Sequence, residues 1–367
     1  MNLVNTTKLA AAYTMATDKT GRESLVVVAK GTYGIPMRPD RPPELLPVQV
    51  PPVAADEFTG EPGFSAPLYE CDFAATKPRC DVILNGSCYA PNGVPATRVD
   101  VGLQVGSMRK WFAVVGARKF QMGLVVGLAA SKPQPFTVMP ISYNNAYGGV
   151  DKSNSDPAKH TWHPLNHAGV GHHPNASSSL VIDKPLPNTE APNDPITRPN
   201  GKHVPMAFGP IGRGWKQRIK WAGTYDKAWK DNKFPFLPDD FDPHYFQSAP
   251  EDQWIIHPKG SEEVALINLT PAGRTSFRLP ADLRLPILFA DRDGKVAEIP
   301  AVVDTVLIEP DHKRFMLVWR GSVPVRRTIR EIRTMTIGKI VSGITREKHA
   351  GGQLTSLAGL AAQNARR

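Results

Sequence analysis

The stretch HVPMAFGPIGRGWKQRIKWAGTYDKAWKDNKFPFLPDDFDPHYFQSAPEDQWIIH, residues 203–257, does not have the alternating pattern of an ordinary series of strands. It holds 11 of the 29 aromatic residues of the chain. Six prolines interrupt it, and each removes a backbone donor and fixes φ, which prevents long helices and strands. Large aromatic side chains dominate cores and interfaces. We therefore predict an irregular, well-packed segment that either fills the space between β units or presents a surface.

Strand signals lie on both sides of this stretch. β-branched or alternating runs occur in residues 21–35 and 80–120 before it, and in residues 263–320 after it. Turn pairs such as Asn85-Gly86 separate them at the spacing of an antiparallel sandwich or barrel. The fold expected is mainly β, with two antiparallel β-sandwich-like units joined by a long Pro/aromatic-rich irregular segment with a few short helices.

These patterns predict four regions along the chain. An N-terminal β domain covers residues 1–135, and the irregular segment packed between the β units covers 136–260. A C-terminal β unit follows at 261–342, and a flexible basic tail at 343–367. Inside the irregular segment, Thr224 and Asp242-Pro243 are expected to begin short helices, because Asp or Thr suits the N-cap and Pro the first helical position.

The positive charge is concentrated at the C-terminal end. The chain has 367 residues and a net charge of +10, and residues 313–367 contribute 12 Lys/Arg against 2 acidic residues. The rest of the chain is therefore neutral. A solvated tail is one interpretation, and binding of nucleic acid or an acidic partner through this basic end is another.

Cysteine usage and hydropathy indicate where the protein works. Three cysteines leave an odd count and form no Cys-x-x-Cys pair, which favours a reducing compartment. No apolar run approaches the ~18–20 residues needed to span a bilayer. We expect a soluble, cytoplasmic protein that does not contact a membrane.

Motifs for catalysis are scarce. Gly-x-Ser-x-Gly is absent, and residues 209–214 lack the strand, helix and lysine context of a phosphate-binding loop. A carbohydrate-active enzyme using the acidic and aromatic residues of 213–242 is an alternative, because glycosidases need two carboxylates at a fixed separation. Its candidate carboxylates are Asp226, Asp239, Asp240 and Asp242. No catalytic residue, and no cofactor, is predicted.

Five of the ten histidines cluster in a short loop region: His160, His163, His167, His172 and His173. A metal site needs converging ligands, and no His-Glu-x-x-His motif or cysteine pair accompanies them. A polar loop is the preferred interpretation and no metal is predicted, although the sequence leaves metal binding at this cluster open.

An interaction surface fits the stretch at residues 213–229 better than catalysis does. Trp, Tyr and Arg are the residue types that anchor protein interfaces. The alternative is that these side chains pack between the two β units. The candidate partner-binding residues are Arg213, Trp215, Arg218, Trp221, Tyr225 and Trp229.

Several segments, in order along the chain, resemble the type VI secretion-associated proteins of domain-of-unknown-function family 2169. The matching segments are residues 28–33, 80–86, 115–118, 139–149, 186–190 and 208–241, which include VAKGTY, CDVILNG, VGAR, MPISYNNAYGG, LPNTE and FGPI. One departure is residues 166–172, NHAGVGH, where the family has an Asn-Pro-x-Gly-x-Gly pattern.

This resemblance implies a non-catalytic adaptor or effector chaperone of a Gram-negative bacterium. Such proteins bind a toxic effector and help to load it onto the spike-tip proteins, of the PAAR and VgrG type, of the type VI secretion system. The expected partners are therefore a cognate effector and a spike-tip protein, and nucleic acid is not expected to be one. The effector, the binding surface and the stoichiometry cannot be read from the sequence.

Overall fold

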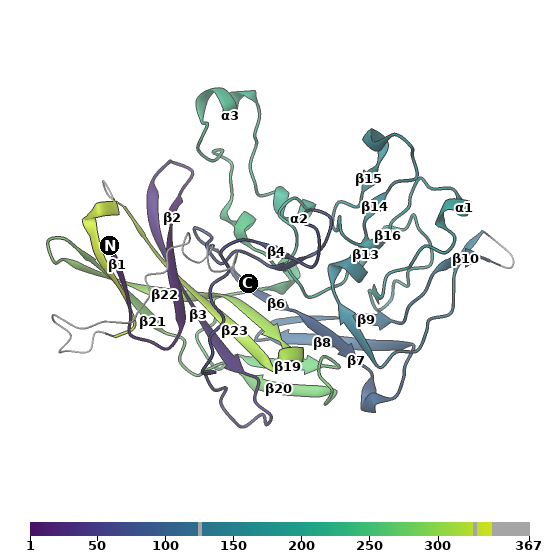
Figure 1. Ribbon diagram of the computed structural model, residues 1–367, viewed down its shortest axis with the longest axis horizontal. Helices are drawn as coiled ribbons and strands as arrows, with labels where there is room; N and C mark the ends of the chain where they lie inside the picture. The colour runs from purple at the N-terminus through teal and green to yellow at the C-terminus, as the bar shows by residue number, and fades with distance from the viewer. Residues whose placement is uncertain (124–126, 326–328, 340–367) are drawn as a thin grey trace.

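The computed structural model describes residues 1–123, 127–325 and 329–339, and strands make up most of its regular structure (Figure 1). The prediction of a mainly β protein with a few short helices is confirmed. The described α-helices are α1 (Ser178–Val181), α2 (Lys216–Ile219) and α3 (Lys227–Asn232). The short 3₁₀ helices are η1 (Pro91–Gly93), η2 (Tyr143–Asn145), η3 (Pro157–Lys159), η4 (Pro243–Phe246), η5 (Glu251–Gln253), η6 (Pro310–His312) and η7 (Ile329–Glu331). None of these helices is long and apolar enough to cross a membrane.

A nine-stranded sheet forms one layer of the molecule. Its main path runs in the order β1-β24-β21-β22-β23-β3-β2, and β6 and β18 attach to it beside β22. The strands are β1 (Asn2–Asn5), β24 (Ile332–Ile337), β21 (Leu285–Asp291), β22 (Val296–Glu309), β23 (Arg314–Pro324), β3 (Glu23–Gly34), β2 (Ala10–Thr17), β6 (Cys80–Leu84) and β18 (Trp254–Ile255).

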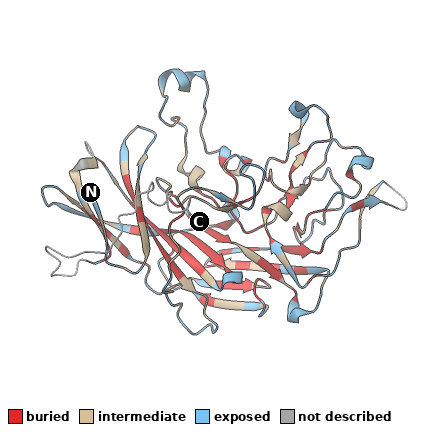
Figure 2. Ribbon diagram, in the orientation of Figure 1, coloured by how far each residue is buried: buried red, intermediate tan, exposed pale blue. Residues whose placement is uncertain are grey.

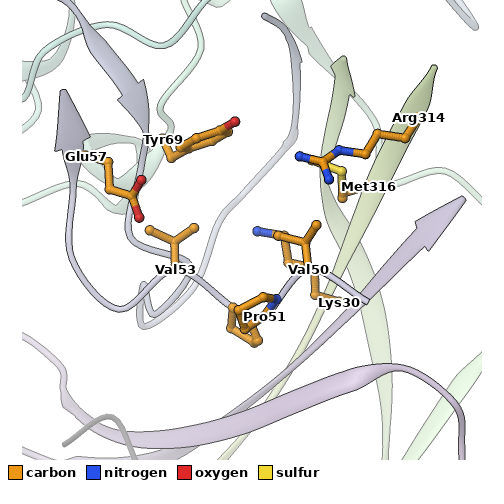
Figure 3. Close-up of a pocket in the computed structure, with 9 residues that line it drawn as sticks. Lys30, Val50, Pro51, Val53, Glu57, Tyr69, Arg314 and Met316 are labelled. Carbon is orange, nitrogen blue, oxygen red and sulfur yellow. The ribbon is translucent and has the colours of Figure 1, made fainter. Parts of the chain in front are cut away.

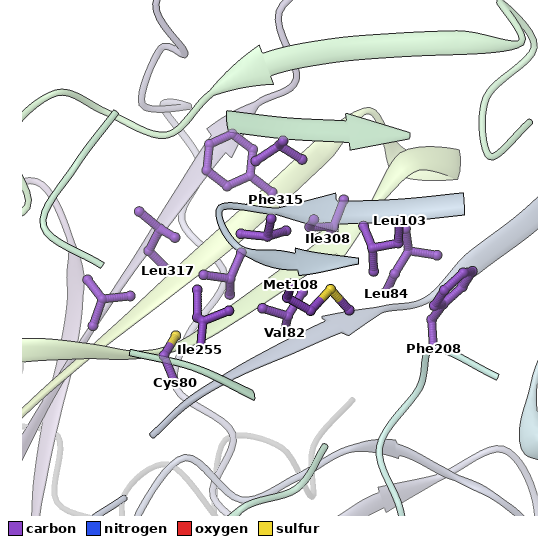
Figure 4. Close-up of a cluster of buried hydrophobic side chains, with 14 of the residues drawn as sticks. Cys80, Val82, Leu84, Leu103, Met108, Phe208, Ile255, Ile308, Phe315 and Leu317 are labelled. Atoms are coloured by element: carbon purple, nitrogen blue, oxygen red, sulfur yellow. The ribbon is translucent and has the colours of Figure 1, made fainter. Parts of the chain in front are cut away.

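A five-stranded sheet, in the order β17-β9-β8-β19-β20, forms the second layer. Its strands are β17 (Thr189–Glu190), β9 (Met108–Val115), β8 (Arg98–Val105), β19 (Glu263–Ile267) and β20 (Arg274–Arg278). One hydrophobic core joins the two sheets, with Leu103 and Met108 from this layer beside Leu84, Ile308 and Leu317 from the other (Figure 4). The alternation of residues 98–106 puts every second side chain of β8 into this core.

Strands from both ends of the chain pair within the same sheets. β3 pairs antiparallel with β23 over eleven residue pairs, from Arg314↔Gly34 to Pro324↔Ser24, and β8 pairs antiparallel with β19. The sheets therefore do not follow the predicted boundaries at residues 135 and 261, since each takes strands from both predicted β units. The local pattern identifies a strand, but its partner is chosen by long-range packing.

The segment predicted as irregular has two parts. The first contains short paired strands and α1, around a small separate core made of Phe120, Tyr147, Val181, Leu186 and Ile196. The second part, residues 203–257, runs along β6, where β18 pairs with it and the amide of Leu84 donates to Phe208 O. The remaining short strands are β4 (Glu57–Phe58) with β5 (Pro67–Tyr69), β7 (Gly86–Tyr89) with β12 (Val138–Ile141), β10 (Phe120–Met122) with β11 (Leu128–Ala130), β13 (Tyr147–Gly148) with β16 (Val170–Gly171), and β14 (Val150–Asp151) with β15 (Thr161–Trp162). The predicted basic tail at 343–367 lies outside the described residues.

Candidate functional site

Of the six residues predicted to bind a partner, two are buried, three are partly buried and Tyr225 is exposed. Trp215 is 5% exposed, packs its ring edge-on against Tyr143 at 5.2 Å between ring centroids, and belongs to the main core. Arg218 is 1% exposed. A side chain with so little accessible surface does not contact a partner in this conformation. For these two residues the alternative interpretation, packing within the fold, is the correct one.

Arg218 and Arg213 join residues 203–257 to the loop that contains Asp56 and Glu70. Arg218 donates to both carboxylate oxygens of Glu70 at 2.9 Å and to the backbone oxygen of Tyr245 at 2.8 and 3.0 Å. Arg213 donates to both oxygens of Asp56 at 2.6 and 3.0 Å and lies 2.5 Å from Glu70 Oε1. Two guanidinium groups thus share two carboxylates in the forked geometry that makes such pairs strong. These arginines hold the fold together.

Trp221 lies half-buried where the chain leaves the body of the protein. Its ring lies 5.1 Å from that of His244, which in turn stacks on Trp254 at 5.3 Å and 23°. The amide of Asp242 donates to Trp221 O at 3.0 Å, so the two ends of the segment between these residues lie side by side. We call residues 222–241 the aromatic knob.

The aromatic knob projects from the sheets, with α3 at its tip (Figure 1). Asp226 caps α3 by accepting from the amide of Trp229 at 2.8 Å, so the predicted helix start at Thr224 is wrong by two residues. At the base of the knob, Asp240 accepts from the amide and hydroxyl of Thr224 at 2.9 and 2.7 Å. Local hydrogen bonds, not a hydrophobic core, therefore define its shape.

The tip of the knob is exposed, as its pale blue colour in Figure 2 shows, whereas Phe241 at its base is buried. Tyr225 is 53% exposed, Phe234 68% and Phe236 45%, and α3 contains no buried residue. Trp229 lies between them, edge-on to Tyr225 at 4.7 Å and to Phe234 at 5.8 Å, with Nε1 donating to Phe236 O. Beside Tyr225 and Trp229 is a shallow depression of 510 Å³.

Of the six predicted residues, Tyr225 and Trp229 lie on the knob, whereas Phe234 and Phe236, which lie beside them, were not among those predicted. The signal for them was the run Phe234-Pro235-Phe236-Leu237-Pro238, because two prolines so close together leave no room for a strand that would bury the rings. Exposure itself depends on where the neighbouring elements lie, which the sequence does not give.

The base of the knob contacts the turn between β2 and β3. A Cβ placed on Gly21 would lie 2.7 Å from the ring of Phe236, so that ring packs directly on the glycine backbone. Lys19 Nζ donates to Asp239 O at 3.1 Å. The knob and the β2–β3 turn therefore form one continuous surface.

The four carboxylates considered for a glycosidase each have a local partner. Asp226 caps α3, and hydrogen bonds from Thr224 lower the pKa of the Asp240 carboxyl. Asp239 pairs with Lys233 at 2.7 Å. Asp242 caps η4, as its Asp-Pro sequence predicted, and lies 2.6 Å from His244 Nδ1.

A separate cavity of 490 Å³ lies between the proline-rich loop and the nine-stranded sheet (Figure 3). Lys30 and Arg314 point into it beside Val50 and Val53. Lys30 is paired with Asp72 at 2.9 Å, and Arg314 Nε with Glu309 at 2.6 Å. Because its cations are neutralised within the protein, this cavity does not attract an anion strongly.

The predicted histidine cluster is brought together only in part. His163 and His172 lie 5.0 Å apart between ring centroids, and both lie edge-on to Tyr147, together with His203. Burial, and then the neighbouring histidines, lower the pKa of His163 to about 4. Within the described parts of the chain, no group of three or more His, Cys, Asp or Glu side chains has the geometry to hold a metal ion.

Comparison with protein families gives one match. The family model described as an uncharacterized protein conserved in bacteria (DUF2169) matches residues 20–320, which include the five-stranded sheet, the knob and the histidine cluster. The match covers most of the nine-stranded sheet but not β1, β2 or β24. No curated protein and no solved structure matches the chain.

Proposed function

Because the chain belongs to the bacterial family DUF2169, we propose that it is a non-catalytic adaptor of type VI secretion that holds a partner protein at the aromatic knob. The partner is a toxic effector, which the adaptor helps to load onto a spike-tip protein of the PAAR or VgrG type. The secretion role rests on the family resemblance, and the knob is the binding surface.

The observation that carries the binding role is the exposure of Tyr225, Phe234 and Phe236 on a projecting segment. Large aromatic side chains that pack edge-on outside the core gain little stability for the fold, since they bury little apolar area. The same residue types supply most of the binding energy at protein interfaces, where a partner buries them. Their clustering at one tip supports a docking surface.

Two alternatives have less support. A carbohydrate-active enzyme needs two free carboxylates across a substrate, whereas Asp226, Asp240 and Asp242 are engaged in caps and turns. Nucleic-acid binding rests on the basic end, most of whose length falls outside the described residues. A screen for glycan turnover and an oligonucleotide titration at several salt concentrations test them directly.

The adaptor role is tested with the double variant Tyr225→Ser/Phe234→Ser in a bacterium that produces the secretion apparatus. We expect the effector to be lost from affinity purifications of the variant and from the culture medium. The thermal midpoint should not change, because both side chains are exposed. Trp111→Ser is the control, because Trp111 is a large aromatic residue, 75% exposed, that lies away from the knob sequence on β9 in the five-stranded sheet. Retention of effector binding and export by the knob variant would contradict the proposal.

A further inference from the structure

β2 forms one end of the nine-stranded sheet. It covers Ala10–Thr17 and pairs antiparallel with β3 from Ala10↔Lys30 to Thr17↔Glu23. The order of the sheet places no strand on its other side among the described residues. Its outer edge is therefore a row of backbone groups without a strand to pair with.

The hydrogen bonds at the end of the β2–β3 hairpin show which residues of β2 direct their backbone groups outward. The amide of Asp18 donates to Arg22 O at 3.0 Å. The backbone N–H and C=O groups of residue 18 are therefore directed toward β3. In an antiparallel pair, successive residues alternate between the two sides of the strand. Residues 11, 13, 15 and 17 consequently direct their N–H and C=O groups away from β3, and in the described chain none of them has another backbone partner.

The other sheet ends are protected in ways that β2 is not. β20 carries Arg274 and Arg278 at its two ends, while β17 has two residues and β1 has four. Charge and short length are the usual means of preventing one sheet edge from pairing with another chain. β2, AAAYTMAT, is eight residues long and contains neither a charged residue nor proline.

This open edge is continuous with the aromatic knob. The turn that ends β2 carries Gly21 and Lys19, which contact Phe236 and Asp239 of the knob. A partner held by the knob would therefore lie next to the end of this open edge.

We propose that β2 binds an extended, uncharged segment of the protein partner as an added strand, while the knob holds the same partner through its aromatic side chains. This inference rests on the proposed function and specifies the mode of binding. An extended backbone is the ligand that satisfies alternating donors and acceptors along a strand. Tyr13 and Met15 share one face of the strand, so apolar side chains of the added strand fit beside them.

The test uses the full chain and a phage library of random dodecapeptides. Peptides are selected on the wild-type protein, and their affinities are then measured on Met15→Pro, whose proline removes an outward N–H without breaking the pairing of β2 with β3. Met15→Thr is the matched control, because it changes the side chain and keeps the amide. We expect uncharged, proline-free peptides whose affinity falls about tenfold in Met15→Pro, the loss of one hydrogen bond, and is kept in Met15→Thr.

Hydrogen exchange gives a second readout that does not depend on a variant. A bound strand should slow exchange at the amides of Ala11, Tyr13 and Met15 and leave those of Ala12 and Thr14, already bonded to β3, unchanged.

Thr17→Pro, at the end of the strand, replaces Met15→Pro if the latter does not fold. Selected peptides that bind both proline variants normally, protection without this alternation, or no selection of peptides would each overturn the inference.

The same variants separate this inference from the proposed function. If Tyr225→Ser/Phe234→Ser loses the effector and folded Met15→Pro keeps it, the knob binds the partner and strand addition is refuted. If both variants keep the effector, both proposals fail. If the knob variant and Met15→Pro both lose the effector while Met15→Thr keeps it, the result supports the proposed function and strand addition together.

Discussion

Replacing Arg218 with alanine should destabilise the fold severely. Arg218 is buried and makes two hydrogen bonds to Glu70, whose side chain is 8% exposed, and three to the carbonyl oxygens of Tyr245 and Ile211. Removing one member of a buried ion pair costs about 3–5 kcal/mol, because the other charge is left without compensation. Arg213 still contacts Glu70 in the variant, so we expect a loss near the lower limit, about 3 kcal/mol.

Urea unfolding, followed by tryptophan fluorescence and circular dichroism, measures this loss from the change in midpoint at constant slope. Arg38→Ala is the matched control, since it breaks an exposed pair with Asp40 and should leave the midpoint unchanged. Adding Glu70→Gln to Arg218→Ala removes the uncompensated charge, so the double variant should be more stable than the sum of the single losses predicts. A loss below about 1 kcal/mol for Arg218→Ala, or strict additivity, would refute the structural role of this pair.

Three further predictions concern the core, the histidine cluster and a turn. Trp215→Ala should cost about 3–5 kcal/mol in urea unfolding, because it empties a packed core position; a loss as small as that of an exposed residue would contradict its burial. The pKa of His163 is lowered to about 4 in the folded protein, whereas a histidine of the unfolded chain has a pKa of about 6.5. Between these two values the unfolded chain binds a proton at this residue and the folded protein does not. The free energy of unfolding is therefore unaffected by His163 above pH 6.5 and falls as the pH drops toward 4. Thermal midpoints at pH 7 and 5 should show this fall, and His163→Phe should reduce it. Gly149→Ala should prevent accumulation of folded protein in expression trials, because φ is +98° and a Cβ would lie 2.2 Å from Gly169 O, whereas normal yield would show that the turn can move.

Several of the segments that carry the family resemblance contain buried polar residues. Lys30 and Thr32 of VAKGTY and Asp81 of CDVILNG are buried, and Glu190 of LPNTE forms a buried pair with Arg118 of VGAR at 2.6 Å. Sequence reasoning identified these segments without assigning them a role. Their physical role is to satisfy polar groups inside the fold. The longest matching segment, residues 208–241, differs from them because it includes the exposed aromatic knob.

The sequence by itself determined the elements that local physics specifies. β-branched and alternating runs made β3, β6 and β8 strands, and Asp242-Pro243 began a short helix. These outcomes need only steric preferences and hydrogen bonds within a few residues, so the pattern along the chain is sufficient.

The tertiary structure alone decided which strands pair and which aromatic residues are exposed. β3 finds β23 almost three hundred residues later, and no local signal encodes that choice. Trp215 and Tyr225 lie ten residues apart and belong to the same residue class, yet one packs in the core and the other is half exposed on the knob. Burial depends on what distant segments place against a side chain, and for this reason only the folded protein shows how far each of the six predicted site residues is exposed.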